Sequence, residues 1–122
     1  MEGFLVKPIG VVTRVEGDTS TIEIYPQYQP GLYRLGEGRI YVLYWFHLRD
    51  NEEHRGVLRV VPRRHGETEE RGVFASRSPS RPNPIGLTEV ELLRVEGGRL
   101  KVRGLDALEG SPVLDLKPVE HR

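Results

Sequence analysis

The sequence of 122 residues predicts a mainly β protein. We expect a single domain, residues 1–122, that forms a small β-barrel or a strongly curved antiparallel sheet of about seven strands with little helix. Two observations carry this prediction. Short segments of strand character recur at close spacing, separated by turns rich in glycine and proline. No long segment repeats its apolar residues at the helical spacing of about 3.6 residues.

The N-terminal part of the chain contains three candidate strands. Residues 7–12 contain a short apolar run after a proline, and residues 20–25 alternate between polar and apolar side chains. Residues 39–46 are apolar on both faces and rich in β-branched and aromatic side chains, which is typical of a central strand. The segment 29–38, which is rich in glycine, predicts a turn with at most one turn of helix.

The middle of the chain predicts two further strands, residues 56–62 and 72–76. Between them, residues 63–70 are polar and charged, so we expect a mobile loop there. The second of these strands is expected to run directly into a segment that is rich in proline and arginine.

The C-terminal part predicts a hairpin and a closing strand. Residues 85–96 alternate, so that one set of side chains can face a core while the other faces solvent. A Gly-Gly pair at 97–98 marks a turn, and residues 99–104 are expected to pair back on the preceding strand. Residues 113–119 supply the last strand.

Composition excludes several classes of protein. Hydrophobic residues make up 37% of the chain and charged residues 30%, and no apolar run approaches the roughly 20 residues of a membrane helix. The chain has no cysteine, which excludes disulfides, thiolate metal sites and a cysteine nucleophile. Its four histidines lack metal-ligand spacing, so no metal is expected. We expect no signal peptide and therefore a cytoplasmic location, and the sequence shows no glycine-rich nucleotide fingerprint or Walker loop.

Arginine is concentrated between residues 55 and 81, although the net charge is zero. Seven arginines lie within this stretch, at Arg55, Arg59, Arg63, Arg64, Arg71, Arg77 and Arg81. A local basic patch can bind RNA even in a neutral protein, because guanidinium groups pair with phosphates and stack on bases. A solvated arginine-rich surface would have the same composition, so both interpretations stay open.

Residues 76–84 (Ser-Arg-Ser-Pro-Ser-Arg-Pro-Asn-Pro), which we call the proline loop, are unusually stiff. Pro82 and Pro84 fix their own φ angles, and each pushes the residue before it, Arg81 and Asn83, toward extended backbone. Gly86 then permits a close approach to the backbone. A loop ordered in advance loses little entropy when it binds a ligand, so it suits the wall of a small-molecule pocket. A rigid corner between strands would need the same stiffness.

Four segments of the chain, residues 8–12, 22–32, 41–50 and 72–119, resemble the TsaA-like proteins, also called the TrmO family. The resemblance implies an S-adenosylmethionine-dependent methyltransferase on a β-barrel. It further implies a homodimer with the cofactor site near the subunit interface. The implied substrate is tRNA, methylated on the N6 nitrogen of the threonylcarbamoyladenosine beside the anticodon.

The chain departs from the family pattern in two respects. The usual insert after the first strand is missing, since residues 11–21 join that strand directly to the next, and no additional C-terminal domain is expected. An alternative is therefore an S-adenosylmethionine-binding barrel with a different substrate or a regulatory, non-catalytic role. A small RNA-binding barrel without a cofactor is a third possibility. It is disfavoured because the aromatics, only 7% of residues, cluster in one apolar strand.

The family pattern also implies the site residues. The implied cofactor-binding residues are Phe46, His47, Arg77, Ser78, Arg81, Pro82, Pro84, Ile85, Gly86, Leu87, Leu105 and Asp106. Asn83, Asp115 and Lys117 are the implied catalytic residues. Asp115 and Lys117 are two apart on the last strand and share a face, so they either line the cleft or form an exposed cross-strand ion pair.

Several roles have alternatives. Phe46 and His47 are expected to end the apolar strand on opposite faces, where His47 could order the cofactor or remain a satisfied edge histidine. Asp106 either binds the ribose or amine of the cofactor or caps its own turn. Arg77 or Arg81 would suit the threonyl carboxylate of the substrate. The candidates for contact with the RNA backbone, in a loop that could equally be solvated, are Arg63, Arg64 and His65.

Overall fold

The computed structural model describes residues 2–62 and 68–120 and divides the chain into two compact units. The first, here the sheet unit, consists of residues 1–45 and 87–122. The second, here the loop unit, is Phe46–Gly86. The loop unit therefore interrupts the sheet unit in sequence, and it contains the proline loop.

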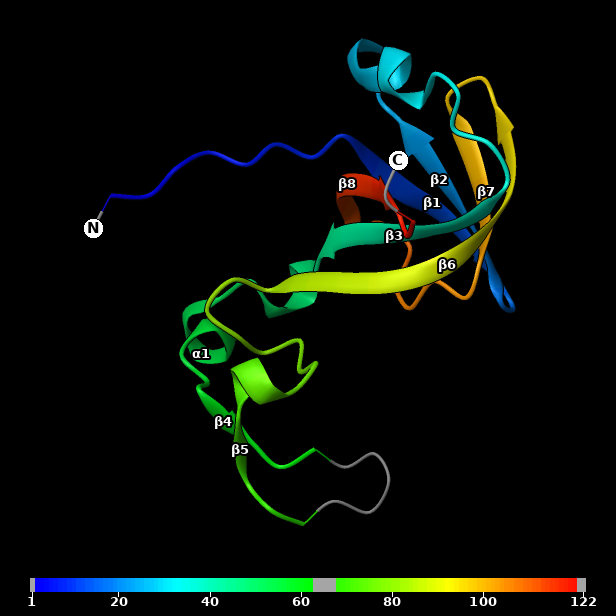
Figure 1. Cartoon of the computed structure of the whole chain (residues 1–122). Coiled ribbons are helices and arrows are strands. Elements are labelled where there is room, and N and C mark those ends of the chain that lie inside the picture. Colours follow the sequence, from blue (N-terminus) through cyan, green and yellow to red (C-terminus); the bar gives the residue numbers. More distant parts are fainter. Residues whose placement is uncertain (1, 63–67, 121–122) are drawn as a thin grey trace. The chain divides into compact units, whose positions relative to one another are not determined.

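A strongly curved antiparallel sheet of six strands makes up the sheet unit (Figure 1). Its strands are β1 (Gly10–Glu16), β2 (Thr19–Ile24), β3 (Gly38–Trp45), β6 (Ile85–Glu96), β7 (Arg99–Arg103) and β8 (Pro112–Pro118). They follow one another in the order β1-β2-β7-β6-β3-β8, and β8 also pairs with β1, Gly10 opposite Val113. The predicted mainly β class with a strongly curved sheet is confirmed.

The core of the sheet unit lies on one face of these strands. Ile22 and Ile24 of β2 are buried, and Ile22 faces the fully buried Leu100 across the β2–β7 ladder. The buried apolar side chains of this unit are Val12, Ile22, Ile24, Ile40, Val42, Tyr44, Val90, Leu92, Leu100, Val102 and Val113. Successive side chains of a strand point to opposite faces, so the polar residues between these buried ones lie on the other face of the sheet.

Two glycines are required by the backbone of this sheet. Gly97 has a φ of 58° in the tight turn between β6 and β7, a conformation that costs glycine little. Gly10 of β1 lies so close to β2 that a Cβ atom would come within 2.2 Å of the carbonyl oxygen of Glu23. The predicted hairpin of residues 85–96 and 99–104 is therefore present, as β6 and β7.

The described residues of the loop unit form short elements. They are the 3₁₀ helix η2 (His47–Arg49), helix α1 (Glu52–Arg55), strand β4 (Arg59–Val60), strand β5 (Arg71–Gly72) and the 3₁₀ helix η4 (Val73–Ala75). Strands β4 and β5 pair antiparallel as a separate two-stranded sheet. Helix α1 begins after Asn51, whose side-chain oxygen accepts a hydrogen bond from the His54 backbone N–H at 2.9 Å.

Some boundaries differ from the prediction. The strand expected over 72–76 ends at Gly72, because the chain then turns into η4, where the Ser76 N–H donates to the Val73 carbonyl at 3.1 Å. The strand expected over 56–62 shortens to β4. Another 3₁₀ helix, η1 (Pro26–Leu32), begins before the segment expected to turn.

The expectation that Phe46 and His47 end the apolar strand on opposite faces is wrong. Strand β3 ends at Trp45, and Phe46 precedes η2, which begins at His47. The Arg49 N–H donates to the Phe46 carbonyl at 2.9 Å and closes a tight turn, so strand alternation does not apply there.

Part of the predicted mobile loop, including Arg63, Arg64 and His65, lies outside the described residues. Among the residues that the structure does describe, no helix has the length and apolar composition that a membrane crossing requires. The same residues contain no group of three or more acidic or histidine side chains placed to hold a metal ion.

Candidate functional site

The proline loop is braced by hydrogen bonds within itself. The backbone N–H groups of Ser78 and Ser80 donate to the hydroxyls of Ser76 and Ser78, each at 3.2 Å. The guanidinium Nη1 of Arg81 donates to the carbonyls of Ser76 at 3.2 Å and Ser78 at 3.0 Å. Arg81 is half-buried and its guanidinium holds its own loop together, whereas Arg77 is exposed.

Ser80 anchors the middle of this loop in the interior of the loop unit. Its side chain is 7% exposed. The Ser80 hydroxyl lies 2.9 Å from Nδ1 of His54 and accepts from Nη1 of Arg49 at 3.2 Å. A buried hydroxyl without partners would cost free energy, and here it has two.

The end of the proline loop is held at two further points. The Phe46 N–H donates to the Pro84 carbonyl at 2.7 Å, and the Ile85 N–H donates to the Asn83 carbonyl at 2.7 Å. Arg55 of α1 donates to Asn83 Oδ1 at 3.3 Å and forms an ion pair with Asp50 at 2.9 Å. Asn83 is exposed, and its side-chain NH₂ has no partner among the residues that the structure describes. This amide is therefore presented to solvent on a fixed backbone.

The predicted site residues divide between the two units. The loop unit contains Phe46, His47, Arg77, Ser78, Arg81, Pro82, Asn83, Pro84, Ile85 and Gly86. Within this set, Pro84 and Gly86 are buried, whereas Ile85 is 41% exposed. The sheet unit contains Leu87, Leu105, Asp106, Asp115 and Lys117. The roles of all these residues remain predictions.

Asp106 follows β7 in a turn that is fixed by a buried tyrosine. Tyr44 of β3 is 2% exposed, and its phenol donates to the Asp106 backbone carbonyl at 2.7 Å. The Thr88 hydroxyl of β6 lies 2.9 Å from the same phenol oxygen. Because the tyrosine holds the Asp106 backbone, the carboxylate of Asp106 stays exposed on a constrained turn.

Asp115 and Lys117 lie on one face of β8, as expected, and both are exposed. They are opposite Leu43 and Tyr41 of β3. Asp115 Oδ1 accepts from the backbone N–H of the next residue, Leu116, at 2.9 Å. Within the part of the chain that the structure describes, the two side chains form no ion pair with each other, so their charges are available to a ligand.

Sequence reasoning missed the contacts of Ser80 with Arg49 and His54. His54 lies 26 residues before Ser80 in the chain, and no periodic pattern relates positions on separate short elements. The nearby sequence signal is Asn51 followed by Glu52 and Glu53, which locates a helix start but not the serine.

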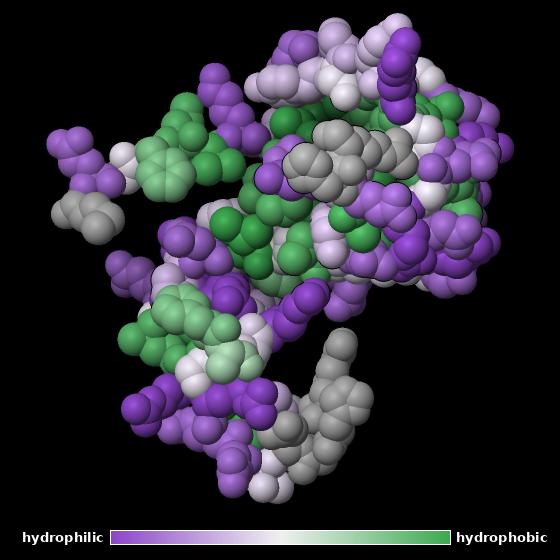
Figure 2. Space-filling view, in the orientation of Figure 1, coloured by the Kyte–Doolittle hydropathy of each residue, from purple (hydrophilic) through white to green (hydrophobic). Residues whose placement is uncertain are grey.

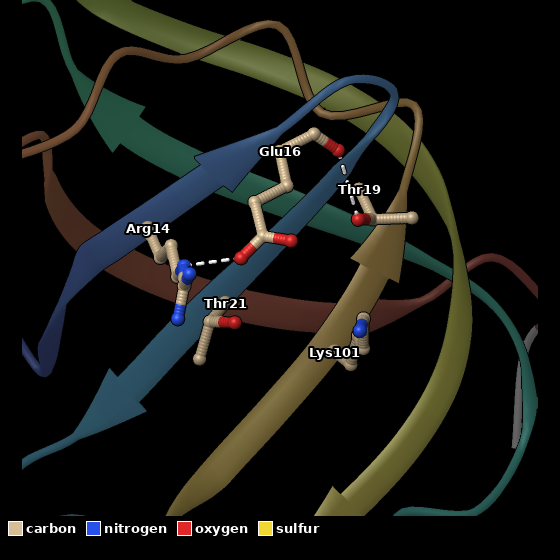
Figure 3. A pocket seen from close by; sticks show the side chains of 5 residues that line it. All are labelled: Arg14, Glu16, Thr19, Thr21 and Lys101. Carbon is tan, nitrogen blue, oxygen red and sulfur yellow. Dashed lines mark hydrogen bonds and ion pairs between the residues drawn. The ribbon is translucent and has the colours of Figure 1, made fainter.

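A small polar hollow lies elsewhere, on the strands of the sheet unit (Figure 3). It is lined by Arg14, Glu16, Thr19, Thr21 and Lys101. Arg14 and Glu16 form an ion pair across it. The hollow is shallow and contains none of the predicted site residues.

Comparison with known proteins identifies a family of relatives. Residues 10–122 match the family model of the tRNA-methyltransferase O N-terminal domain. An S-adenosyl-L-methionine-binding protein of Archaeoglobus fulgidus is 51% identical over 127 residues, covering 93% of this chain and 87% of that protein. A probable S-adenosyl-L-methionine-binding protein of Methanothermobacter thermautotrophicus is 46% identical and covers 93% and 88% of the two chains.

A solved structure shares the fold. The crystal structure of TrmO from Pseudomonas aeruginosa superposes with a TM-score of 0.72 at 30% identity, covering 98% of this chain and 56% of that chain. This chain therefore spans little more than half the length of that solved protein.

Proposed function

This chain belongs to the tRNA-methyltransferase O family, and on that premise we propose that it is an S-adenosylmethionine-dependent methyltransferase. The proposed substrate is tRNA, and the proposed target is the N6 nitrogen of threonylcarbamoyladenosine beside the anticodon. The family match over residues 10–122 is the observation that carries the proposal. Relatives named as S-adenosyl-L-methionine-binding proteins support the cofactor, and the solved TrmO supports the reaction.

The groups on the proline loop fit the chemistry of S-adenosylmethionine. The exposed side-chain NH₂ of Asn83 is a donor on a fixed backbone, which suits an acceptor on the adenine or ribose. The exposed guanidinium of Arg77 suits a carboxylate, either the methionine tail of the cofactor or the threonyl group of the substrate. Ile85, which directly follows the loop and is 41% exposed, offers apolar surface to a purine ring. A donor, a cation and an apolar contact are the groups that such a ligand needs.

Stiffness of this loop contributes to catalysis in the proposed mechanism. When bound, S-adenosylmethionine supplies a methyl group activated on a sulfonium, so the protein need not form a covalent intermediate. The residues of the chain must align the reacting groups and exclude water. Because Arg81, Ser78 and Ser80 fix the loop before binding, little conformational freedom is lost on association.

Asp115, Lys117 and Asp106 have proposed roles in the sheet unit. The target nitrogen loses its proton as it gains the methyl group, and the exposed carboxylate of Asp115 is the proposed acceptor. Lys117 on the same face is the proposed counter-charge for the substrate. The carboxylate of Asp106, on the turn held by Tyr44, is the proposed partner of the ribose hydroxyls or the methionine amine.

We also propose a homodimer with the cofactor site near its interface, in the cytoplasm where tRNA is modified. Exposed apolar side chains support an interface. Phe4 is 91% exposed and Leu5 78% in the N-terminal segment before β1, where Figure 2 shows consecutive hydrophobic residues. In the loop unit Phe74 is 80% exposed. Light scattering coupled to gel filtration tests this proposal: a mass of twice 13.9 kDa supports it and a mass of 13.9 kDa overturns it.

A second candidate function is binding of S-adenosylmethionine with a different substrate or a regulatory role. The names of two relatives favour keeping it, because these proteins, at 51% and 46% identity, are named for cofactor binding.

Transfer of a labelled methyl group from S-adenosylmethionine to tRNA separates the two functions. One tRNA sample carries threonylcarbamoyladenosine, and the matched sample lacks that modification. Label in the modified tRNA alone supports the proposed reaction. Cofactor binding, seen as a rise in Tm by mass action, without label in either tRNA supports the second function. Absence of both overturns both proposals.

A further inference from the structure

We propose that Arg49, His54 and Ser80 form a buried clamp that positions the proline loop for S-adenosylmethionine. This inference rests on the proposed cofactor site and deepens it, because none of the three residues is among those predicted to touch the ligand. The clamp is defined by two contacts of the Ser80 hydroxyl, at 2.9 Å from His54 Nδ1 and 3.2 Å from Arg49 Nη1.

The clamp is built around one hydroxyl, that of Ser80, which the protein has removed from water. Ser80 is a buried polar residue, at 7% exposed, and Arg49 and His54 are half-buried. A hydroxyl in such a place needs partners, and an arginine cation donates one of the stronger hydrogen bonds available to it. These hydrogen bonds therefore hold the Ser80 side chain in one position, and this restrains the loop backbone at Ser80.

The partners of Ser80 are themselves held in place. His54 lies in α1, whose first turn is capped by the side chain of Asn51. Arg49 ends η2, which begins immediately after Phe46. Phe46 donates its N–H to the Pro84 carbonyl at 2.7 Å. The segment from Phe46 to His54 thus holds the loop at Ser80 and again at Pro84.

The same segment also reaches the candidate ligand-binding side chain. Arg55, adjacent to His54, donates to Asn83 Oδ1 at 3.3 Å while it pairs with Asp50 at 2.9 Å. This contact orients the Asn83 carboxamide so that its oxygen is used and its NH₂ is left for a ligand. Ser80 is three residues before Asn83, so loss of the clamp would release the stretch that sets the position of this amide.

Loss of the clamp should raise the Kd for S-adenosylmethionine, although the clamp residues are not proposed to touch the ligand. A loop that is released must be ordered again when the ligand binds, and that cost appears in the dissociation constant. If the bound state needs the hydrogen bond of Ser80 to Arg49 or His54, loss of that bond should raise the Kd about tenfold. His54 and Ser80 would act through Asn83, so they are positioning residues.

Isothermal titration of the full chain with S-adenosylmethionine at a temperature well below every Tm tests the clamp. The variants are His54→Phe, which keeps a ring but removes Nδ1, and Ser80→Ala. His54→Asn is the conservative variant, because its carboxamide can replace Nδ1 as donor or acceptor. Ser20→Ala is the matched control, since Ser20 is also a buried serine, at 3% exposed, but lies in β2 of the sheet unit.

The clamp predicts a Kd about tenfold higher for His54→Phe and Ser80→Ala, recovery toward the wild-type Kd in His54→Asn, and no change in Ser20→Ala. A lower Tm with an unchanged Kd in the first two variants would show a purely structural role and overturn the clamp. If the wild-type chain binds S-adenosylmethionine and both variants bind equally well, the clamp fails while the cofactor site stands. If the wild-type chain does not bind it, the proposed function fails and the clamp with it.

Discussion

Replacement of Tyr44 by phenylalanine tests how the turn that carries Asp106 is held. The substitution removes a phenol that donates to the Asp106 carbonyl at 2.7 Å and lies 2.9 Å from the Thr88 hydroxyl. The ring remains in the core, where Tyr44 is 2% exposed, so packing changes little. The loss is therefore confined to hydrogen bonds.

The size of the effect follows from these two bonds. Each is worth a net of about 0.5–1.5 kcal/mol, which gives about 1–3 kcal/mol for the pair. Asp106 is exposed, so water can replace the phenol at its carbonyl and reduce that part of the loss. Thr88 is half-buried and recovers less. We expect Tyr44→Phe to lower the free energy of unfolding by about 1.5 kcal/mol.

Urea unfolding followed by tryptophan fluorescence measures this change. The chain has one tryptophan, Trp45, and it lies in the sheet unit with Tyr44 and Asp106, so its signal reports on the correct unit. Tyr33→Phe is the control, because Tyr33 is 81% exposed. Equal unfolding free energies for the two variants would refute the reasoning that the Tyr44 hydrogen bonds hold the turn.

Three further predictions use unfolding and activity measurements. Gly10→Ala should lower the free energy of unfolding in urea by about 1–3 kcal/mol or more, because its Cβ would lie 2.2 Å from the Glu23 carbonyl oxygen. The control Gly98→Ala should cost clearly less, because the nearest atoms to its Cβ belong to the flexible side chain of Gln29. Equal losses in the two variants would contradict the close approach at β1. Leu100→Ala, at a fully buried position, should cost about 2–5 kcal/mol in the same assay, and a loss below about 1 kcal/mol would argue against the core position. Asp115→Asn, at an exposed position, should change the unfolding free energy by less than about 0.5 kcal/mol but slow methyl transfer at least tenfold, and an unchanged rate would remove Asp115 as proton acceptor.

The elements that could be predicted from the sequence are those governed by local patterns. Alternation at Ile22 and Ile24 identified β2 and its buried face, and the Gly97–Gly98 pair identified the β6–β7 hairpin because a tight turn needs a positive φ. These signals act over a few residues. They can therefore be recognised in the sequence without knowledge of the rest of the fold.

The elements that could not be predicted depend on contacts between distant segments. The Phe46 N–H pairs with the carbonyl of Pro84, which is 38 residues later in the chain, and no local pattern indicates that contact. The family resemblance implies that Arg81 binds the cofactor, and the sequence does not show that its guanidinium donates to the Ser76 and Ser78 carbonyls in the folded loop. The clamp at Ser80 has the same origin, since its partners come from separate short elements.

Mass spectrometry of the nucleosides released from tRNA after reaction with S-adenosylmethionine is the most direct test of the proposed reaction. The methyltransferase proposal predicts that threonylcarbamoyladenosine gains the mass of one methylene unit and that fragmentation locates the methyl group on N6. The Asn83→Ala variant should give this product more slowly, since Asn83 is the exposed amide of the proline loop. A methyl group on a different nucleoside, or an unchanged nucleoside profile with cofactor bound, would contradict the assignment of this chain as a threonylcarbamoyladenosine methyltransferase.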